Sequence, residues 1–229
     1  MCGRYALYGP LSRLSERFSA SIDELPADLG PRYNAAPMQR LPVVRQRPGG
    51  ERVVHLLRWG LVPSWAKDET IATRLINARG ETLAAKPAFR AAYKARRCIV
   101  PASGFYEWMA IPGGKQPYYI EPANDALFGF ASLWERWTSA EGAPIDTFTV
   151  VTTEANASMQ ALHERMPVIL QPGDYALWLS RDTAPERLGQ LLAPCPDAML
   201  RMHPVSKAVG NVRNEGPELI EAISAPQPR

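Results

Sequence analysis

The chain has 229 residues, of which 46% are hydrophobic and 21% charged, proportions that are ordinary for a soluble globular protein. No apolar run approaches the roughly 20 residues of a membrane-spanning helix, and the first five residues lack the apolar segment of a signal peptide. Three widely spaced cysteines do not form a secreted disulfide framework, so we expect a cytoplasmic protein with reduced thiols and no membrane attachment.

The formal net charge of +3 is divided unevenly along the chain. Residues 1–120 hold 18 Lys and Arg against 9 Asp and Glu, whereas residues 121–229 hold 8 against 14. A basic first half favours an acidic partner, most commonly a phosphate backbone. A source genome rich in arginine explains the same numbers, and charge alone leaves both explanations open.

The scattered prolines divide the chain into short elements. Runs rich in β-branched and aromatic residues predict strands, and stretches of helix-forming composition predict helices. In chain order we expect a strand at 53–59, a helix at 81–96, a strand, turn and second strand at 96–108, strands at 126–134 and 147–153, and helices at 154–162, 173–179 and 183–192. Strands clustered in the middle with helices around them indicate one compact α+β domain, and the last dozen residues indicate a loose tail.

Cys2 directly follows the initiator methionine, and a residue as small as cysteine allows that methionine to be trimmed. Trimming would leave a free α-amine, with a reference pKa of about 7.7–8.0, which can attack an aldehyde to form an imine. The neighbouring thiol can then close a five-membered thiazolidine. An internal cysteine cannot do so, because its nitrogen is part of an amide. A buried, inert Cys2 is the competing interpretation, and the residue by itself favours it.

Two segments carry groups suited to binding DNA. Residues 32–37 offer a guanidinium, an aromatic ring and an amide where glycine and proline force an extended or turned path, although they could merely form a turn. Trp59 and Trp65 flank an expected loop beside glycine and proline, where exposed rings can stack on unpaired bases. Because tryptophan usually packs in the core, we expect one of the two to be buried and the other exposed.

Asn77 and Arg79 precede the expected helix at 81–96, and Arg90 lies within it. Asn77 could orient a reacting group through hydrogen bonds, and the two arginines could hold phosphates. Glu81 is equally suited to capping that helix or to pairing with an arginine.

Two titratable residues stand out by their neighbours. Glu107 lies between Tyr106 and Trp108, and a carboxylate removed from water by aromatic rings suits proton transfer. The alternative is that strand alternation points Glu107 outward. His163 stands near an arginine at the entrance to an expected strand and could act as acid or base, although a lone histidine is usually structural. No pair of His or Cys has metal-ligand spacing and no Gly-rich phosphate loop is present, so we expect no metal and no cofactor.

Taken in order, these segments resemble the SOS-response-associated peptidase (SRAP) family, whose members shield abasic sites. The similar stretches are 1–5, 32–37, 59–65, 77–79, 97–108, 163–170 and, more weakly, 205–211. Tyr5 replaces a common phenylalanine of that pattern, and residue 36 is a small departure from it. We therefore expect one SRAP-like domain over residues 1–217, with a central, mostly antiparallel, barrel-like curved sheet and flanking short helices, followed by a tail over 218–229.

The resemblance implies that Cys2 forms a thiazolidine cross-link with the ring-opened sugar aldehyde of an abasic site in single-stranded DNA. By the same resemblance, Asn77 positions the N-terminal residue, while Glu107 and His163 move protons. The positions that match the family's DNA contacts, or shape its DNA groove, are Arg4, Asn34, Pro37, Trp59, Trp65, Arg79, Arg90 and Arg165. The stretch around Arg90 matches less well than the others. We expect a monomer whose partner is single-stranded DNA.

Three other activities stay open. The family name records a cysteine peptidase that processes itself, and Cys2, His163 and Glu107 can be drawn as its triad. A non-catalytic reader of modified or single-stranded DNA would need the tryptophans and arginines but not Cys2. An abasic-site lyase would follow if the imine, which acidifies the adjacent sugar carbon, led to β-elimination; we expect trapping to dominate.

Overall fold

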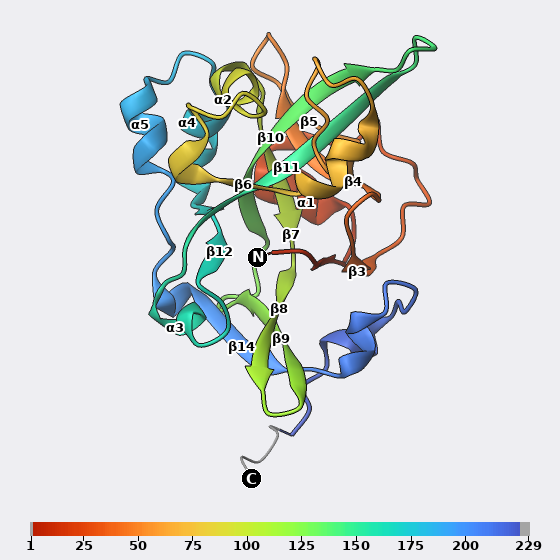
Figure 1. Cartoon of the computed structure of the whole chain (residues 1–229), viewed down its shortest axis with the longest axis vertical. Coiled ribbons are helices and arrows are strands. Elements are labelled where there is room, and N and C mark those ends of the chain that lie inside the picture. The colour runs from red at the N-terminus through yellow and green to blue at the C-terminus, as the bar shows by residue number, and fades with distance from the viewer. Residues whose placement is uncertain (1, 225–229) are drawn as a thin grey trace.

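Five strands of the larger of two sheets close into a barrel in the computed structural model, which describes residues 2–224 (Figure 1). β4 (Arg40–Gln46) pairs with β5 (Arg52–Trp59) and β7 (Arg97–Ala102), β7 pairs with β10 (Phe128–Thr138), and β10 pairs with β11 (Pro144–Glu154). The barrel closes where β11 returns to β5, in the one parallel pairing of the five. This closure confirms the expected barrel-like, mostly antiparallel sheet.

Short strands and helices surround the barrel. None of the described helices is long and apolar enough to cross a membrane. The barrel sheet also includes β2 (Ala20–Ser21), β6 (Asn77–Arg79), β12 (Arg165–Pro167) and β13 (Ile169–Leu170). The second sheet has the order β14 (Leu200–Pro204), β9 (Gly114–Pro122), β8 (Gly104–Ile111), β1 (Tyr5–Leu7) and β3 (Arg32–Ala35). The α-helices are α1 (Ser12–Phe18), α2 (Arg90–Ala95), α3 (Ala157–Gln160), α4 (Tyr175–Leu179) and α5 (Pro185–Gln190). Six 3-10 turns are η1 (Glu69–Arg74), η2 (Gly80–Thr82), η3 (Pro172–Asp174), η4 (Asp197–Met199), η5 (Lys207–Gly210) and η6 (Pro217–Ile220).

Alternation along the barrel strands separates two hydrophobic cores, because successive side chains of a strand point to opposite faces. The inner core fills the barrel and continues to the second sheet. Its buried members on the barrel strands are Leu41, Val43, Leu57, Trp59, Cys98, Val100, Ala102, Phe128, Phe130, Phe148 and Val150. The intervening positions face outward against the helices, and they are Val44, Val54, Ile99, Ala131, Leu133 and Val151. Both sets are almost completely buried, so each strand is apolar on both faces.

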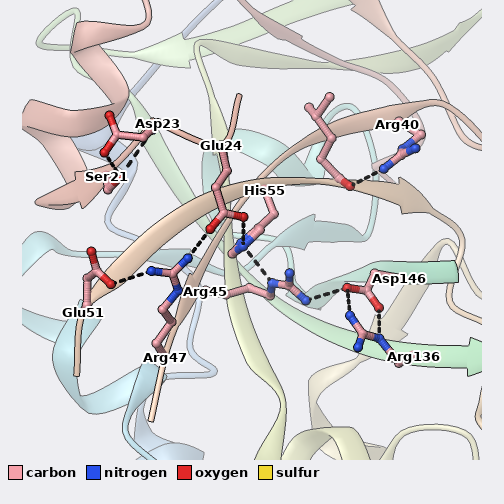
Figure 2. Close-up of polar contacts among 11 residues, drawn as sticks. Ser21, Asp23, Glu24, Arg40, Arg45, Arg47, Glu51, His55, Arg136 and Asp146 are labelled. Atoms are coloured by element: carbon pink, nitrogen blue, oxygen red, sulfur yellow. Dashed lines mark hydrogen bonds and ion pairs between the residues drawn. The ribbon is translucent and has the colours of Figure 1, made fainter. Parts of the chain in front are cut away.

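Charged side chains form a network at one end of the barrel (Figure 2). Those that belong to barrel strands occupy the alternate positions whose side chains point into the barrel. Arg45 donates to Asp146 at 2.8 Å and to Nδ1 of His55 at 3.3 Å, and its guanidinium lies 4.5 Å from the ring centre of Trp134. His55 Nε2 lies 2.9 Å from the carboxylate of Glu24. His55 and Trp59 both face inward on β5, so the network is separated from Trp59 by about 13 Å along that strand.

Two of the expected helices are wrong in extent. Over 81–96 the structure has only the turn η2 and then α2 from Arg90, because Pro87 disfavours helical backbone before it and cannot supply a helical N–H. Over 154–162 the helix is limited to α3, since Glu154 still belongs to β11 and Asn156 caps the helix by accepting from the Met159 amide at 3.0 Å. The strands expected at 53–59, 96–108, 126–134 and 147–153 are present, with β10 and β11 longer than expected.

Part of the expected tail is packed. Leu219 in η6 is buried, and the amide of Ile223 donates to the carbonyl of Pro204 at 3.0 Å. Residues 218–224 therefore pack against β14 and do not form the loose tail that the sequence suggested. Residues 225–229 of that tail lie outside the described residues, and the domain boundary at 217 stays a prediction.

Candidate active site and nucleic-acid interface

Cys2 lies fully buried in the inner core, where the barrel meets the second sheet. Its carbonyl accepts a hydrogen bond of 2.8 Å from Asn77 Nδ2. Asn77 is placed by the sheet, because β6 runs parallel to β11 with Asn77 opposite Val150. Burial raises the pKa of the Cys2 thiol, and the negative charge of Glu107 raises it further. The thiol is therefore held in its protonated form.

Glu107 faces the same core as Cys2. Along β8, Phe105 belongs to the inner core and Tyr106 to a separate cluster under the second sheet, so alternation places Glu107 on the face of Phe105. Its side chain is only 3% exposed, and the outward orientation considered from the sequence is wrong. The structure thus brings Cys2, Asn77 and Glu107 together.

His163 follows α3, whose Met159 packs in the inner core with Cys2. Its Nδ1 accepts a hydrogen bond of 2.9 Å from the backbone amide of Arg165. An acceptor at Nδ1 leaves the proton of the neutral ring on Nε2. His163 therefore presents an Nε2–H donor, held in orientation by the start of β12.

Arg4 and Asn34 form one buried hydrogen-bonded unit. Arg4 donates to Asn34 Oδ1 at 2.6 Å and to the Val209 carbonyl at 2.7 Å, and its guanidinium lies 5.9 Å from the ring centre of Trp108. Asn34 is 0% exposed, and its Nδ2 donates to the carbonyls of residues 209, 211 and 214. These contacts tie β3 to the loop after β14, so the visible role of Asn34 is to hold that loop.

The two tryptophans have opposite environments, as expected. Trp59 is fully buried, stacks at 6.1 Å on Phe148, and donates from Nε1 to the Ile76 carbonyl at 2.8 Å. Trp65 is 60% exposed in the turn after β5. Pro37 is half-buried in the turn between β3 and β4.

Two of the predicted arginines share a groove. Arg79 and Arg165 line it together with the carboxylates Glu81, Glu154 and Glu164, beside the end of β11. Arg165 is 7% exposed and donates to Glu81 at 2.9 Å and to the Thr152 carbonyl at 2.8 Å, so Glu81 pairs with an arginine as one of its two expected roles. Arg90, by contrast, begins α2, which lies away from the start of the chain near the top of Figure 1.

Sequence reasoning missed Met38. This residue is 38% exposed with a left-handed φ of 72°, and its amide donates to the Trp59 carbonyl at 2.8 Å. Its methyl group occupies the space beside Gly60, where a Cβ would lie 2.4 Å away. Nothing in the local sequence signals this, because the exposure depends on how β3, β4 and β5 meet.

Groups able to accept or donate a proton lie in the part of the molecule around Cys2 and α3. Between residues 2 and 224, no three His, Cys, Asp or Glu side chains gather as metal ligands would. A carboxylate on the face of Cys2 and an imidazole donor near α3 supply an acceptor and a donor of protons.

Comparison with known proteins shows the family of the chain. A family model described as SOS response associated peptidase (SRAP) matches residues 1–212, so the resemblance seen in the sequence segments is confirmed. Abasic site processing protein YoqW of Bacillus subtilis is 42% identical over 226 residues, which cover 97% of this chain and all of YoqW. Abasic site processing protein HMCES of Gallus gallus is 34% identical over 87% of this chain and 68% of its own length. A crystal structure of a protein from Bacteroides thetaiotaomicron has the same fold, with a TM-score of 0.88 at 24% identity over 97% of this chain and all of that one.

Proposed function

Because this chain belongs to the SOS response associated peptidase (SRAP) family, we propose that it processes abasic sites in single-stranded DNA by trapping their aldehyde on Cys2. The observation that carries the proposal is the environment of Cys2. The Cys2 carbonyl accepts a hydrogen bond from Asn77, and the buried carboxylate of Glu107 faces the same core as Cys2.

The chemistry needs only groups that this chain supplies. Removal of Met1 makes Cys2 the N-terminal residue, and its amine adds to the aldehyde carbon of the opened sugar. The carbinolamine loses water to give an imine, and in this proposal the Nε2–H of His163 protonates the departing oxygen. The Cys2 sulfur then adds to the imine carbon while its proton passes through Glu107 to the ring nitrogen. One water is released and a thiazolidine joins protein to DNA.

The thiol environment favours this trap over a peptidase. A cysteine peptidase needs a thiolate nucleophile, which a neighbouring imidazolium or helix N-terminus stabilises. Here burial and the charge of Glu107 raise the thiol pKa and so disfavour the thiolate. A thiazolidine closes within one residue, because the sulfur and the imine carbon belong to the same modified cysteine. The reaction is therefore intramolecular, and this compensates for the weak ionisation of the thiol.

Exposed Arg79 can hold a phosphate, and exposed Trp65 can stack on an unpaired base. Arg165 is buried and paired with Glu81, so its place in the interface rests on the family resemblance. Asn34 and Trp59 are buried, so they would act only by holding the segments that they bond, the loop after β14 and the segment before β6. Arg4 and Pro37 complete the proposed interface, whereas Arg90, on α2 away from the start of the chain, rests on the family resemblance alone.

Intact mass before and after incubation with an abasic oligonucleotide tests the proposal. We expect loss of Met1, then a gain equal to the oligonucleotide minus one water, together with a band that survives denaturing electrophoresis. Cys2→Ala should abolish the adduct while leaving salt-sensitive DNA binding, and Cys195→Ala is the matched cysteine control. One extra residue before Cys2 should also abolish it.

Each rival has its own outcome in that experiment. A denaturant-resistant adduct with Cys2→Ala would show that Cys2 is not the trap. Peptides released from denatured casein without any DNA adduct would favour the peptidase. A time course dominated by cleaved strand would favour the lyase.

A further inference from the structure

A groove lies between α2 and the segment that joins α4 to α5, outside the site around Cys2. In Figure 1 these three helices gather at the upper left, whereas the start of the chain lies near the centre. The groove is lined by the cations Arg90, Lys94, Arg97 and Arg181, and no Asp or Glu is among its lining residues. Between the cations lie apolar surfaces, chiefly of Tyr93, Pro185 and Leu188.

Arg97 holds the two walls of the groove at a fixed spacing. Its buried guanidinium donates to the carbonyls of Tyr93 and Lys94 at the end of α2. It also donates to the carbonyls of Trp178 and Ser180 at the end of α4. A cation bonded to the carbonyl ends of two helices stabilises both ends at once. The groove is therefore formed before any ligand arrives.

The positive charge of the groove is not neutralised. Arg90, Lys94 and Arg181 are exposed, and none of them forms an ion pair with another residue of the described chain. Burial lowers the pKa of Arg97, and the nearby charge of Arg181 acts in the same direction. Some arginines elsewhere on the surface are paired, for example Arg136 with Asp146.

We propose that this groove is a docking site for a short acidic peptide segment of a partner protein that also carries an apolar side chain. Carboxylates of the peptide pair with Lys94, Arg181 and Arg90, and the apolar side chain covers Tyr93 and Pro185. The six residues of α2 span about 9 Å, which is the length of roughly three extended peptide residues. A single-stranded nucleic acid would satisfy the cations, but its bases stack on flat aromatic faces and the groove offers one such ring, Tyr93, among aliphatic residues, so the peptide is the better fit.

Fluorescence anisotropy with a labelled peptide of four aspartates followed by two leucines and a phenylalanine tests the proposal. We expect saturable binding that weakens with salt and at least tenfold with the double variant Lys94→Glu and Arg181→Glu. The control is Arg187→Glu, a single charge reversal on exposed α5 outside the groove, which should bind within twofold of the unaltered protein. The single variants Lys94→Glu and Arg181→Glu, matched to it in charge, should each bind more weakly than this control. Peptides with asparagine for aspartate, or alanine for the three apolar residues, should each bind at least fivefold more weakly.

Several outcomes would overturn the docking site. These are no saturation by 1 mM peptide, equal binding by the double variant, or equal weakening by Arg187→Glu. Displacement of the peptide by oligothymidine, with the double variant losing affinity for both, would assign the groove to nucleic acid instead. Adduct formation with an abasic oligonucleotide is measured on the same variants and should be unchanged, so a failure of this inference is distinguishable from a failure of the proposed function.

Discussion

The hydrogen bond from Asn77 to the Cys2 carbonyl is the most direct test of how the reacting residue is held. Asn77→Leu keeps a side chain of similar size and removes the donor. A hydrogen bond of this kind is worth about 0.5–1.5 kcal/mol net. If it orients the amine in the transition state, its loss should slow adduct formation roughly 2- to 13-fold, since each 1.36 kcal/mol is a factor of ten in rate.

The assay is a single-turnover time course with protein in excess over an abasic oligonucleotide, quenched in denaturant. Two companion measurements separate positioning from other causes. Thermal unfolding should show that the variant is folded, and noncovalent affinity measured in a Cys2→Ala background should be unchanged. Asn124→Leu makes the same substitution at an exposed turn and should react at the unaltered rate. An Asn77→Leu protein that reacts as fast as the original, or whose deficit lies wholly in DNA affinity, would refute the positioning role.

Two further predictions concern the barrel and its rim. Trp59→Ala should cost about 3–5 kcal/mol of unfolding free energy because the ring is fully buried, whereas Trp65→Ala should change it by less than about 0.5 kcal/mol yet weaken single-stranded DNA binding by about 1–3 kcal/mol. Similar losses of stability in the two variants would contradict this. Burial, with the charge of Arg45, lowers the pKa of His55 below 6.5, so the unfolded chain takes up the proton more readily and the stability that neutral His55 provides is lost as pH falls below about 6.5. Urea unfolding at pH 7.5 and 5.5 should show this decline, and an equally steep decline in His55→Gln would rule His55 out as its source.

Local pattern was sufficient for the strands but not for their closure. The composition of 53–59 and 147–153 predicts β5 and β11, because β-branched and aromatic residues suit a pleated, buried surface. The parallel contact of Thr147 with Arg58 that closes the barrel joins distant parts of the chain and leaves no local signal. The helix expected at 81–96 failed for a different reason: its composition was suitable, but Pro87 prevented continuous helical backbone.

The site was predictable to the extent that chemistry depends on residue type. Cys2, Asn77 and Glu107 were expected from their types and order, and the fold places them on one side of the inner core. The role of Asn34 could not be inferred, because its carbonyl partners lie up to 180 residues further along the chain. The proposed docking groove could not be predicted from the sequence either. Lys94 and Arg181 become neighbours only because the hydrogen bonds of Arg97 hold α2 against α4.

Burial of the reactive cysteine has a consequence for how long it stays usable. The thiolate, not the thiol, is the form of cysteine that reacts with oxidants and with other electrophiles. Burial raises the pKa of Cys2, and also that of Cys98 and Cys195, so all three described cysteines are kept largely as thiols. In the proposed reaction the amine of a trimmed Cys2 needs no thiolate to begin, because it would attack the aldehyde first and bring the imine carbon within reach of the sulfur of the same residue. The same environment that makes Cys2 a poor general nucleophile therefore leaves it competent for a partner that can form an imine.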